Sequence, residues 1–387
     1  MKKLLVLALA LILALGCVSA LAEEELPESL DIQVLVWKYD DTYGSTVRAA
    51  MEKWAAYYSE ELGIDIQLTM YDAADDIGKQ IEQATMICSQ GCDFVIINLA
   101  EVSNGAALTT MFQEAGIPFL FYNKQPAAAT EQEVLVDTGT IFIGTLARQA
   151  GDMQAQILYD LYNADNSIDR NGDGVLQYVQ LMGEPQNDEA IARSQYSVET
   201  AEELGLQMEQ IGETLVCNWD QAQAQEAINA VWAAEGDNIE VIFANNDQMA
   251  LGAVAALNGY GYNTGNEGDP SVVVIGVDAI DAALVSIENG GMSGTVKQDG
   301  DAMGKANIEC AINGALGRDW LYGTDYEYTD DAYHCIRIPY AMITADTLAE
   351  ETTTEETTTE EPAAEEATEE VAEEPTEEAA AEEAAAE

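Results

Sequence analysis

Nine residues of this chain, from Asp169 to Gln177, have the side-chain types and the spacing of a calcium-binding loop. Calcium takes about six to eight oxygen ligands, and such loops supply them from alternate positions, one of them through a backbone carbonyl. The ligand positions hold Asp169, Asn171, Asp173, Val175 and Gln177, and Gly174 stands at the sharp turn. The pattern predicts bound Ca²⁺, with a metal-free Gly/Asp/Asn turn as the plain alternative.

The loop lacks the bidentate Glu that completes an EF-hand, because Gln180 stands at that position. Residues 176–182 alternate in hydrophobicity like a strand, whereas an EF-hand continues as a helix. We therefore expect a structural calcium site on an α/β scaffold, with its remaining carboxylate supplied by a distant segment.

The first 22 residues have the order of a secretory signal. Lys2 and Lys3 precede the apolar run 4–15, and Ala20-Leu21-Ala22 precedes an acidic stretch. The run is too short to span a bilayer permanently. Cleavage after Ala22 is the favoured reading, and lipid attachment at Cys17 is the alternative. Both predict an extracytoplasmic protein, in the periplasm or at the cell surface.

The chain is strongly acidic, with a formal net charge of −57. Residues 349–387 form a predicted disordered tail, because positions 350–387 hold 17 Glu and neither Lys nor Arg. The rest of the chain is also acidic. Nucleic acid and anionic membranes need a basic face, so the charge argues against both as partners.

Cysteine usage does not specify a disulfide framework. Cleavage after Ala22 leaves the five cysteines Cys88, Cys92, Cys217, Cys310 and Cys335. An odd number leaves at least one unpaired, and Cys88 with Cys92 could form a bridge or remain reduced. A zinc site is disfavoured because the single histidine, His334, is far from the other candidate ligands in sequence.

Short apolar runs alternate with longer helix-period stretches from Leu30 to about Met342. The predicted strands are 32–37, 64–69, 94–99, 118–122, 176–182, 239–244 and 271–277. The predicted helices are 46–62, 73–87, 189–204, 221–234, 248–257 and 279–289. Near-continuous apolar strands belong in parallel sheets covered on both faces. The length suits two similar lobes, with a first crossing between them near Gly144-Thr145.

Polar residues follow several of these strands, where open parallel sheets bind ligands. They are Asp41 and Tyr43, Asn98, the stretch 183–189, Asn246, and Asp278. Each alone is more often a helix N-cap. Together with Arg193 and Trp219 they suit a neutral polyol, since carboxylates and amides bind hydroxyls and an aromatic ring covers a C–H face.

From about Ile32 to Leu348 the chain resembles the periplasmic galactose/glucose-binding proteins, receptors of bacterial ABC sugar importers. The matching stretches include 38–41, 97–99, 123–126, 169–177, 183–185, 192–193, 244–247, 276–279 and 294–296. The resemblance implies the type I periplasmic binding protein fold, with two Rossmann-like lobes and parallel sheets joined by a hinge of three crossing strands.

The resemblance also implies a set of ligand contacts. Unchanged sugar contacts fall on Asp41, Asn98, Arg193, Asn246 and Asp278. Trp219 matches the stacking aromatic, and Tyr43 stands where the family usually has Phe. The missing calcium carboxylate falls on Glu240. Three positions differ from the family: Asn187 replaces a His, Glu189 an Asp, and Gln298 an Asn.

The expected lobes are 30–143 plus 299–330 and 144–298 plus 331–348, the second holding the calcium loop. The implied function is capture of a hexose, glucose or galactose, without turnover, and its delivery to an ABC permease by a monomer. A methyl-galactoside or a pentose is an open alternative ligand. A sugar sensor that signals to a chemoreceptor and an extracellular glycan-acting enzyme are the alternative functions.

Overall fold

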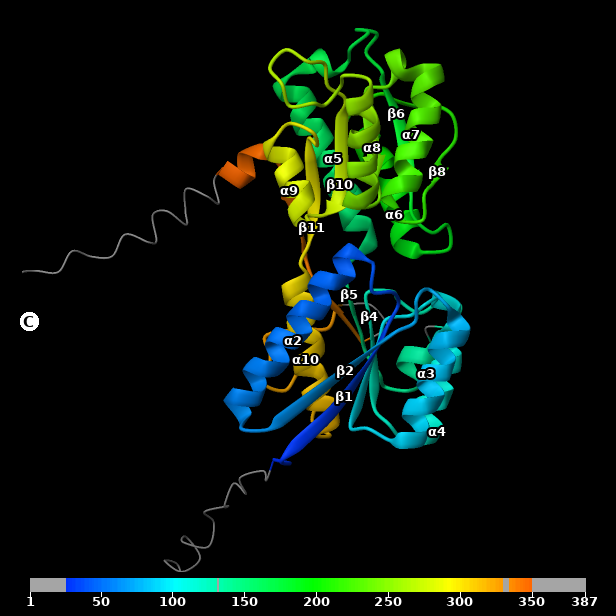
Figure 1. The fold of residues 1–387 in the computed structure, drawn as a ribbon, viewed down its shortest axis with the longest axis vertical. Helices are drawn as coiled ribbons and strands as arrows, with labels where there is room; N and C mark the ends of the chain where they lie inside the picture. The colour runs from blue at the N-terminus through cyan, green and yellow to red at the C-terminus, as the bar shows by residue number, and fades with distance from the viewer. Residues whose placement is uncertain (1–25, 131, 330–333, 350–387) are drawn as a thin grey trace, which may run out of the picture.

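The computed structural model describes residues 26–130, 132–329 and 334–349, so the predicted signal segment and acidic tail lie outside the described part. Two α/β lobes lie one above the other, each built on its own sheet (Figure 1). The predicted fold class, two lobes with mostly parallel sheets, is confirmed. No helix in the described ranges has the length and apolar character needed to cross a membrane.

The first lobe contains a six-stranded sheet in the order β12-β5-β4-β3-β1-β2, and all of its pairings are parallel. Its strands are β1 (Ser29–Val36), β2 (Asp65–Asp72), β3 (Phe94–Ile97), β4 (Phe119–Tyr122), β5 (Phe142–Gly144) and β12 (Cys335–Arg337). Helices α2 (Thr42–Leu62) and α10 (Gly300–Ala315) cover one face, and α3 (Ile77–Gln90) and α4 (Gly105–Ala115) cover the other.

The strands of this sheet other than the edge strand β2 are largely buried. In β1, Ile32 and Val34 pack under α2 and α10, whereas Leu35 packs under α3 and α4. The alternation follows from the period of two along a strand. Continuous apolar runs are therefore required here.

The second lobe has the order β13-β11-β10-β9-β6-β7, and β8 also pairs with β6. Its strands are β6 (Leu176–Met182), β7 (Met208–Gln210), β8 (Leu215–Val216), β9 (Val241–Ala244), β10 (Val273–Asp278), β11 (Gly294–Gln298) and β13 (Tyr340–Ile343). Only β13 runs antiparallel to its neighbour. The helices are α5 (Ala147–Ala164), α6 (Asp188–Glu203), α7 (Gln221–Glu235), α8 (Asp247–Gly259) and α9 (Asp281–Glu288).

Three crossings connect the lobes. The chain passes from β5 to α5 at residues 145–146, from β11 to α10 at residue 299, and from β12 to β13 at residues 338–339. The sequence-based boundary at residue 331 is wrong for one strand. Cys335–Arg337 pairs in parallel with Phe142–Gly144 and so belongs to the first lobe. The third crossing therefore follows β12.

The described cysteines add no covalent constraint. Cys88 and Cys92 form no disulfide with each other, and the cores of the lobes hold Cys217 and Cys310 as apolar packing residues. Burial raises the pKa of the Cys92 thiol to about 12, so it remains protonated. Hydrophobic packing thus holds each lobe together.

Candidate functional site

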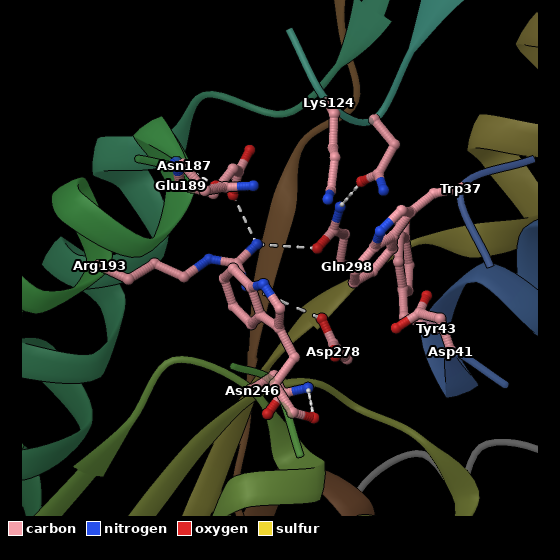
Figure 2. Close-up of a pocket in the computed structure, with 12 residues that line it drawn as sticks. Trp37, Asp41, Tyr43, Lys124, Asn187, Glu189, Arg193, Asn246, Asp278 and Gln298 are labelled. Carbon is pink, nitrogen blue, oxygen red and sulfur yellow. Dashed lines mark hydrogen bonds and ion pairs between the residues drawn. The ribbon is translucent and has the colours of Figure 1, made fainter. Parts of the chain in front are cut away.

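A polar pocket lies between the lobes at the carboxyl ends of both sheets (Figure 2). Its empty space, including the open mouth, is about 420 Å³. The first lobe contributes Trp37, Asp41, Tyr43, Asn123 and Lys124, and the second contributes Asn187, Glu189, Arg193, Trp219, Asn246, Asp278 and Gln298. Strand-end residues that are far apart in sequence therefore converge, as parallel topology requires.

Three of the pocket residues begin helices and face the cavity at the same time. The Asp41 Oδ2 accepts from the Gly44 amide at 2.5 Å, and Asn246 Oδ1 accepts from the Met249 amide at 3.0 Å. Asn187 caps α6 in the same way. Capping uses one polar atom of each side chain and leaves the other for the pocket in Asp41 and Asn187, whereas Asn246 Nδ2 also donates to the Trp219 carbonyl at 3.5 Å. The helix-cap and ligand-contact interpretations are thus compatible at these positions.

Arg193 lies at the centre of the site and is only 3% exposed. Figure 2 shows its guanidinium extending into the pocket, opposite Trp37, Tyr43 and Asp41. Its Nη1 donates to the backbone carbonyl of Asn245 at 2.8 Å, and its Nη2 donates to Gln298 Oε1 at 2.9 Å. Its Nε has no hydrogen-bond partner in the described chain, so one buried donor is available to a ligand.

Glu189 is fully occupied by protein groups. Its Oε2 accepts from Arg193 Nη2 at 2.5 Å and from the Tyr340 hydroxyl at 2.9 Å. Its Oε1 accepts from Thr145 Oγ1 at 2.6 Å. Glu189 therefore joins the pocket arginine to the crossings between the lobes.

Two further carboxylates line the pocket as acceptors, Asp41 from the first lobe and Asp278 from the second lobe. Burial raises the pKa of both carboxyls. For Asp278 the neighbouring Arg193, with Nη1 at 4.0 Å, lowers the pKa and the nearby Asp247 raises it. A hydroxyl that donates to these oxygens would compensate their desolvation.

Trp219 is held in a strained backbone conformation. Its φ is +64°, and the preceding Asn218 also has a positive φ of 49°. A Cβ on Gly183 would lie 2.3 Å from the indole ring, so only glycine leaves room for it. The buried Nε1 has no hydrogen-bond partner in the described chain. Strain retained at a cavity wall is typical of a functional position.

Tyr43 packs into the pocket wall, and its hydroxyl lies 3.4 Å from the sulfur of Met303 on α10. Its exposed fraction is 6%. The hydroxyl that distinguishes it from Phe is thus accommodated by the first lobe. The ring presents an apolar surface to the cavity.

Nine of the ten sequence-predicted contacts line the pocket, and Asn98 does not. Asn98 follows β3 and is 3% exposed. Its backbone amide donates to Leu35 and its carbonyl accepts from Gln80, so the residue is held within the sheet edge. Asn123, which follows the adjacent strand β4 with a φ of +62°, lines the pocket. The Asn98 contact stays a prediction, and its buried Oδ1 has no hydrogen-bond partner in the described chain.

Sequence reasoning also missed Trp37 and Lys124. The Lys124 ammonium lies 3.5 Å from the centroid of the Trp37 ring and 3.0 Å from Glu184 Oε2 in the other lobe. Burial lowers its pKa, and Glu184 opposes that effect. Trp37 ends the predicted strand 32–37 and Lys124 follows the predicted strand 118–122, so the strand-end rule applied consistently would have included them.

The predicted calcium ligands also lie together, at the far end of the second lobe. Glu240, 1% exposed, accepts from the amides of Arg170 and Gln177 at 2.5 and 3.1 Å. Asn171 Nδ2 donates to Gln177 Oε1, and Gln177 Nε2 donates to Asp173 Oδ2. The loop therefore closes on itself and on a carboxylate 63 residues from Gln177.

The donor set fits a hard cation. Asp169 accepts from the amides of Gly172 and Gly174, which fixes the turn. No group of three or more His, Cys, Asp and Glu side chains suited to a metal occurs within the described ranges. The side-chain oxygens of Asn171 and Gln177 and the backbone carbonyl of Val175 would therefore have to complete the coordination, as in oxygen-rich calcium sites.

Chemically, the pocket offers two buried carboxylates, one buried guanidinium, several amides and aromatic walls. It contains no histidine or cysteine. Such a set suits multiple hydrogen bonds to hydroxyls together with ring stacking.

Comparison with known proteins agrees with this geometry. The sequence profile of the periplasmic binding protein domain matches residues 32–319. The D-galactose/methyl-galactoside binding periplasmic protein MglB of Haemophilus influenzae is 31% identical over 353 residues, or 90% of this chain and 99% of that protein. The ribose import binding protein RbsB of Bacillus subtilis is 25% identical, covering 64% of this chain and 70% of the relative.

Solved structures share the architecture. An ABC transporter solute binding protein from Bacillus halodurans C-125 with bound myo-inositol superposes with a TM-score of 0.66 at 25% identity, covering 84% of this chain and 97% of the other. A protein from Actinobacillus succinogenes with bound D-allose has the same TM-score at 19% identity and so supports the fold alone.

Proposed function

The chain belongs to the periplasmic binding protein family, and on that basis we propose that it captures a hexose, glucose or galactose, between its lobes. Proteins of this kind bind sugars for ABC transporters and are not enzymes. The family also implies a periplasmic or other extracytoplasmic location. We propose in addition that the ligand is a hexose and that residues 1–22 are a signal segment that is cleaved off.

The observation that carries the proposal is the composition of the pocket. Asp41 of the first lobe lies across the cavity from Arg193, Asp278 lies beside Arg193 with its Oδ1 4.0 Å from Nη1, and the aromatic rings of Trp219 and Tyr43 stand in the wall. Acceptors and donors on facing sides suit a ring that presents hydroxyls around its edge, and the indole suits its C–H face. The 31% identity to a galactose-binding relative favours a hexose over a pentose.

The residues have complementary roles in this proposal. Asp41 and Asp278 accept hydroxyl protons, and Arg193 Nε and Trp219 Nε1 donate to ligand oxygens, because these two donors are buried without protein partners. Asn187, Asn123 and Asn246 complete the hydrogen bonds. A hydroxyl of the wrong orientation would leave a buried polar group unpaired, at a cost of about 1–3 kcal/mol.

Binding to both lobes provides the transport signal. Residues of the two lobes contribute to one cavity, so the sugar stabilises the closed arrangement by its differential affinity for closed over open. The ABC permease would recognise the closed protein. A chemoreceptor could read the same state, and we expect the protein to act as a monomer.

We also propose a structural calcium site formed by the loop 169–177 and Glu240. Calcium would contribute stability to the second lobe through oxygens of Asp169, Asn171, Asp173, Val175, Gln177 and Glu240. These residues are separate from the pocket lining. We therefore do not propose that the metal contacts the sugar.

Isothermal titration of the mature protein tests the hexose assignment. The panel contains glucose, galactose, xylose, ribose, arabinose and myo-inositol, with calcium present throughout. Tight binding of glucose or galactose, at least about 100-fold over the others, supports the proposal. Preference for a pentose or myo-inositol would replace the hexose while keeping a sugar-binding function, and the absence of binding to every member of the panel would contradict both.

A further inference from the structure

The Tyr340 hydroxyl lies at the junction of the pocket arginine and the crossings between the lobes. It is the first residue of β13, directly after the third crossing, and is 5% exposed. Arg193 Nη2 donates to its oxygen at 2.8 Å. Its proton lies between Glu189 Oε2 and Thr145 Oγ1, both at 2.9 Å.

The same contacts reach all three crossings. Thr145 lies on the first crossing, and Gln298, which accepts from Arg193 Nη2, is the last residue before the second. Tyr340 is the first residue after the third. Apart from Glu189 and Arg193 on α6, each member of this cluster lies on or next to a different crossing.

Arg193 depends on these neighbours for its orientation. Its Nη2 is shared among Glu189, Gln298 and Tyr340, and Nη1 contacts the Asn245 carbonyl. The long side chain has several rotatable bonds, and each hydrogen bond fixes the plane of the guanidinium. Removing the phenol oxygen would take away one of the three acceptors around Nη2. The Glu189 carboxylate and the Gln298 amide oxygen would remain as the only acceptors for its two N–H groups.

We propose that Tyr340 is a positioning residue for ligand binding, which holds the Arg193 guanidinium in the plane that directs its unpaired Nε into the pocket. The assignment rests on the proposed sugar-binding function. Tyr340 does not line the pocket, so it acts through Arg193 and Glu189 rather than through the ligand. It also connects the pocket to the segments that rotate when the lobes close.

The test is a double-mutant cycle between Tyr340→Phe and Arg193→Lys, read as sugar affinity by calorimetry. Tyr340→Phe removes one oxygen and keeps the packing. Alone it should weaken glucose or galactose binding ~10- to 100-fold, because hydrogen bonds to charged groups are strong. In the Arg193→Lys background it should weaken binding by less than ~3-fold. If the double variant loses affinity by the product of the two single losses, the two residues act independently and the proposal is overturned.

Tyr162→Phe on α5, in the core between α5 and the second sheet, is the matched control and should leave the affinity unchanged. A second measurement needs no sugar. In the crystal structure of Tyr340→Phe, the guanidinium should leave its present position 2.9 Å from Gln298 Oε1. An unmoved Arg193 would refute the positioning role, whereas failure of the wild-type protein to bind any hexose would refute the proposed ligand alone.

Discussion

The ammonium of Lys124 lies 3.0 Å from Glu184 Oε2 and forms an ion pair between the two lobes. The Lys124 side chain is 4% exposed and that of Glu184 is 26% exposed. The contact requires the two lobes to lie close together. We therefore expect it to stabilise the closed arrangement.

Glu184 does not line the pocket, so its removal tests closure without removing a ligand contact. Glu184→Ala should weaken sugar binding ~10-fold, because Lys124 would remain buried without its partner. Small-angle X-ray scattering should show a larger radius of gyration in the sugar-free protein. Asp301→Ala, which breaks the exposed pair with Lys53 within one lobe, should change neither quantity. Equal affinities for both variants would contradict the closure role.

Asn98 and Asn123 form a matched pair for the ligand contacts. Asn123→Ala should lower sugar affinity ~10-fold or more, because Asn123 lines the pocket. Asn98→Ala should leave affinity within ~3-fold and lower the free energy of unfolding instead, since Asn98 is buried outside the pocket. Calorimetry and urea unfolding measure the two quantities. The reverse pattern would restore the sequence-based assignment of Asn98.

Chelation tests the calcium loop. Addition of EDTA should lower the melting temperature, and calcium at ~100 times its dissociation constant should add about 2.7 kcal/mol to the free energy of unfolding. Glu240→Gln should abolish the calcium-dependent shift and weaken terbium luminescence. Glu235→Gln, at the end of α7, is the control. A melting temperature that does not respond to EDTA in the wild-type protein would favour a metal-free turn.

Asp247 makes stability depend on pH in an unusual direction. Burial raises its pKa to about 7, against hydrogen bonds from Thr295 and the Ile280 amide that lower it. Between the ordinary value of 3.8 and about 7 the folded state holds more protons than the unfolded state. The free energy of unfolding should therefore fall by up to a few kcal/mol as pH rises through this window.

Urea unfolding at pH 5 and pH 7.5 in saturating calcium measures the effect. The whole acidic chain contributes a loss of stability in the same direction, because its self-repulsion grows with ionisation. Asp247→Asn isolates the single carboxyl and should reduce the difference between the two pH values. An unchanged difference would show that Asp247 is not responsible.

Much of the site follows from rules that act locally. The spacing of residues 169–177 predicts the calcium ligands that the loop itself would supply, and the strand-end rule predicts that Asp41, Asn246 and Asp278 lie in one pocket. Glu240 is predicted as a calcium ligand only from the resemblance to the family, since no feature near the loop indicates it.

The differences between the sequence-based expectations and the structure have physical causes. Asn98 and Asn123 both follow buried strands, and which of them faces the cavity depends on backbone direction at the strand end. Tyr340 carries no local signal, because its hydroxyl acquires a role only where three crossings meet. The three-residue strand Cys335–Arg337 is too short for its periodicity to indicate a lobe.

The interleaved chain path has a consequence for the order of folding. The first sheet begins at Ser29, but the helix that packs on α2 and covers one of its faces is Gly300–Ala315. That face, with Ile32 and Val34, is covered only in part, by α2, until nearly the whole chain has been made. The second lobe is almost contiguous, from Ala147 to Gln298, and lacks only β13. Contacts of long sequence separation form slowly. The lobe that starts first in the sequence is therefore the one that is completed last.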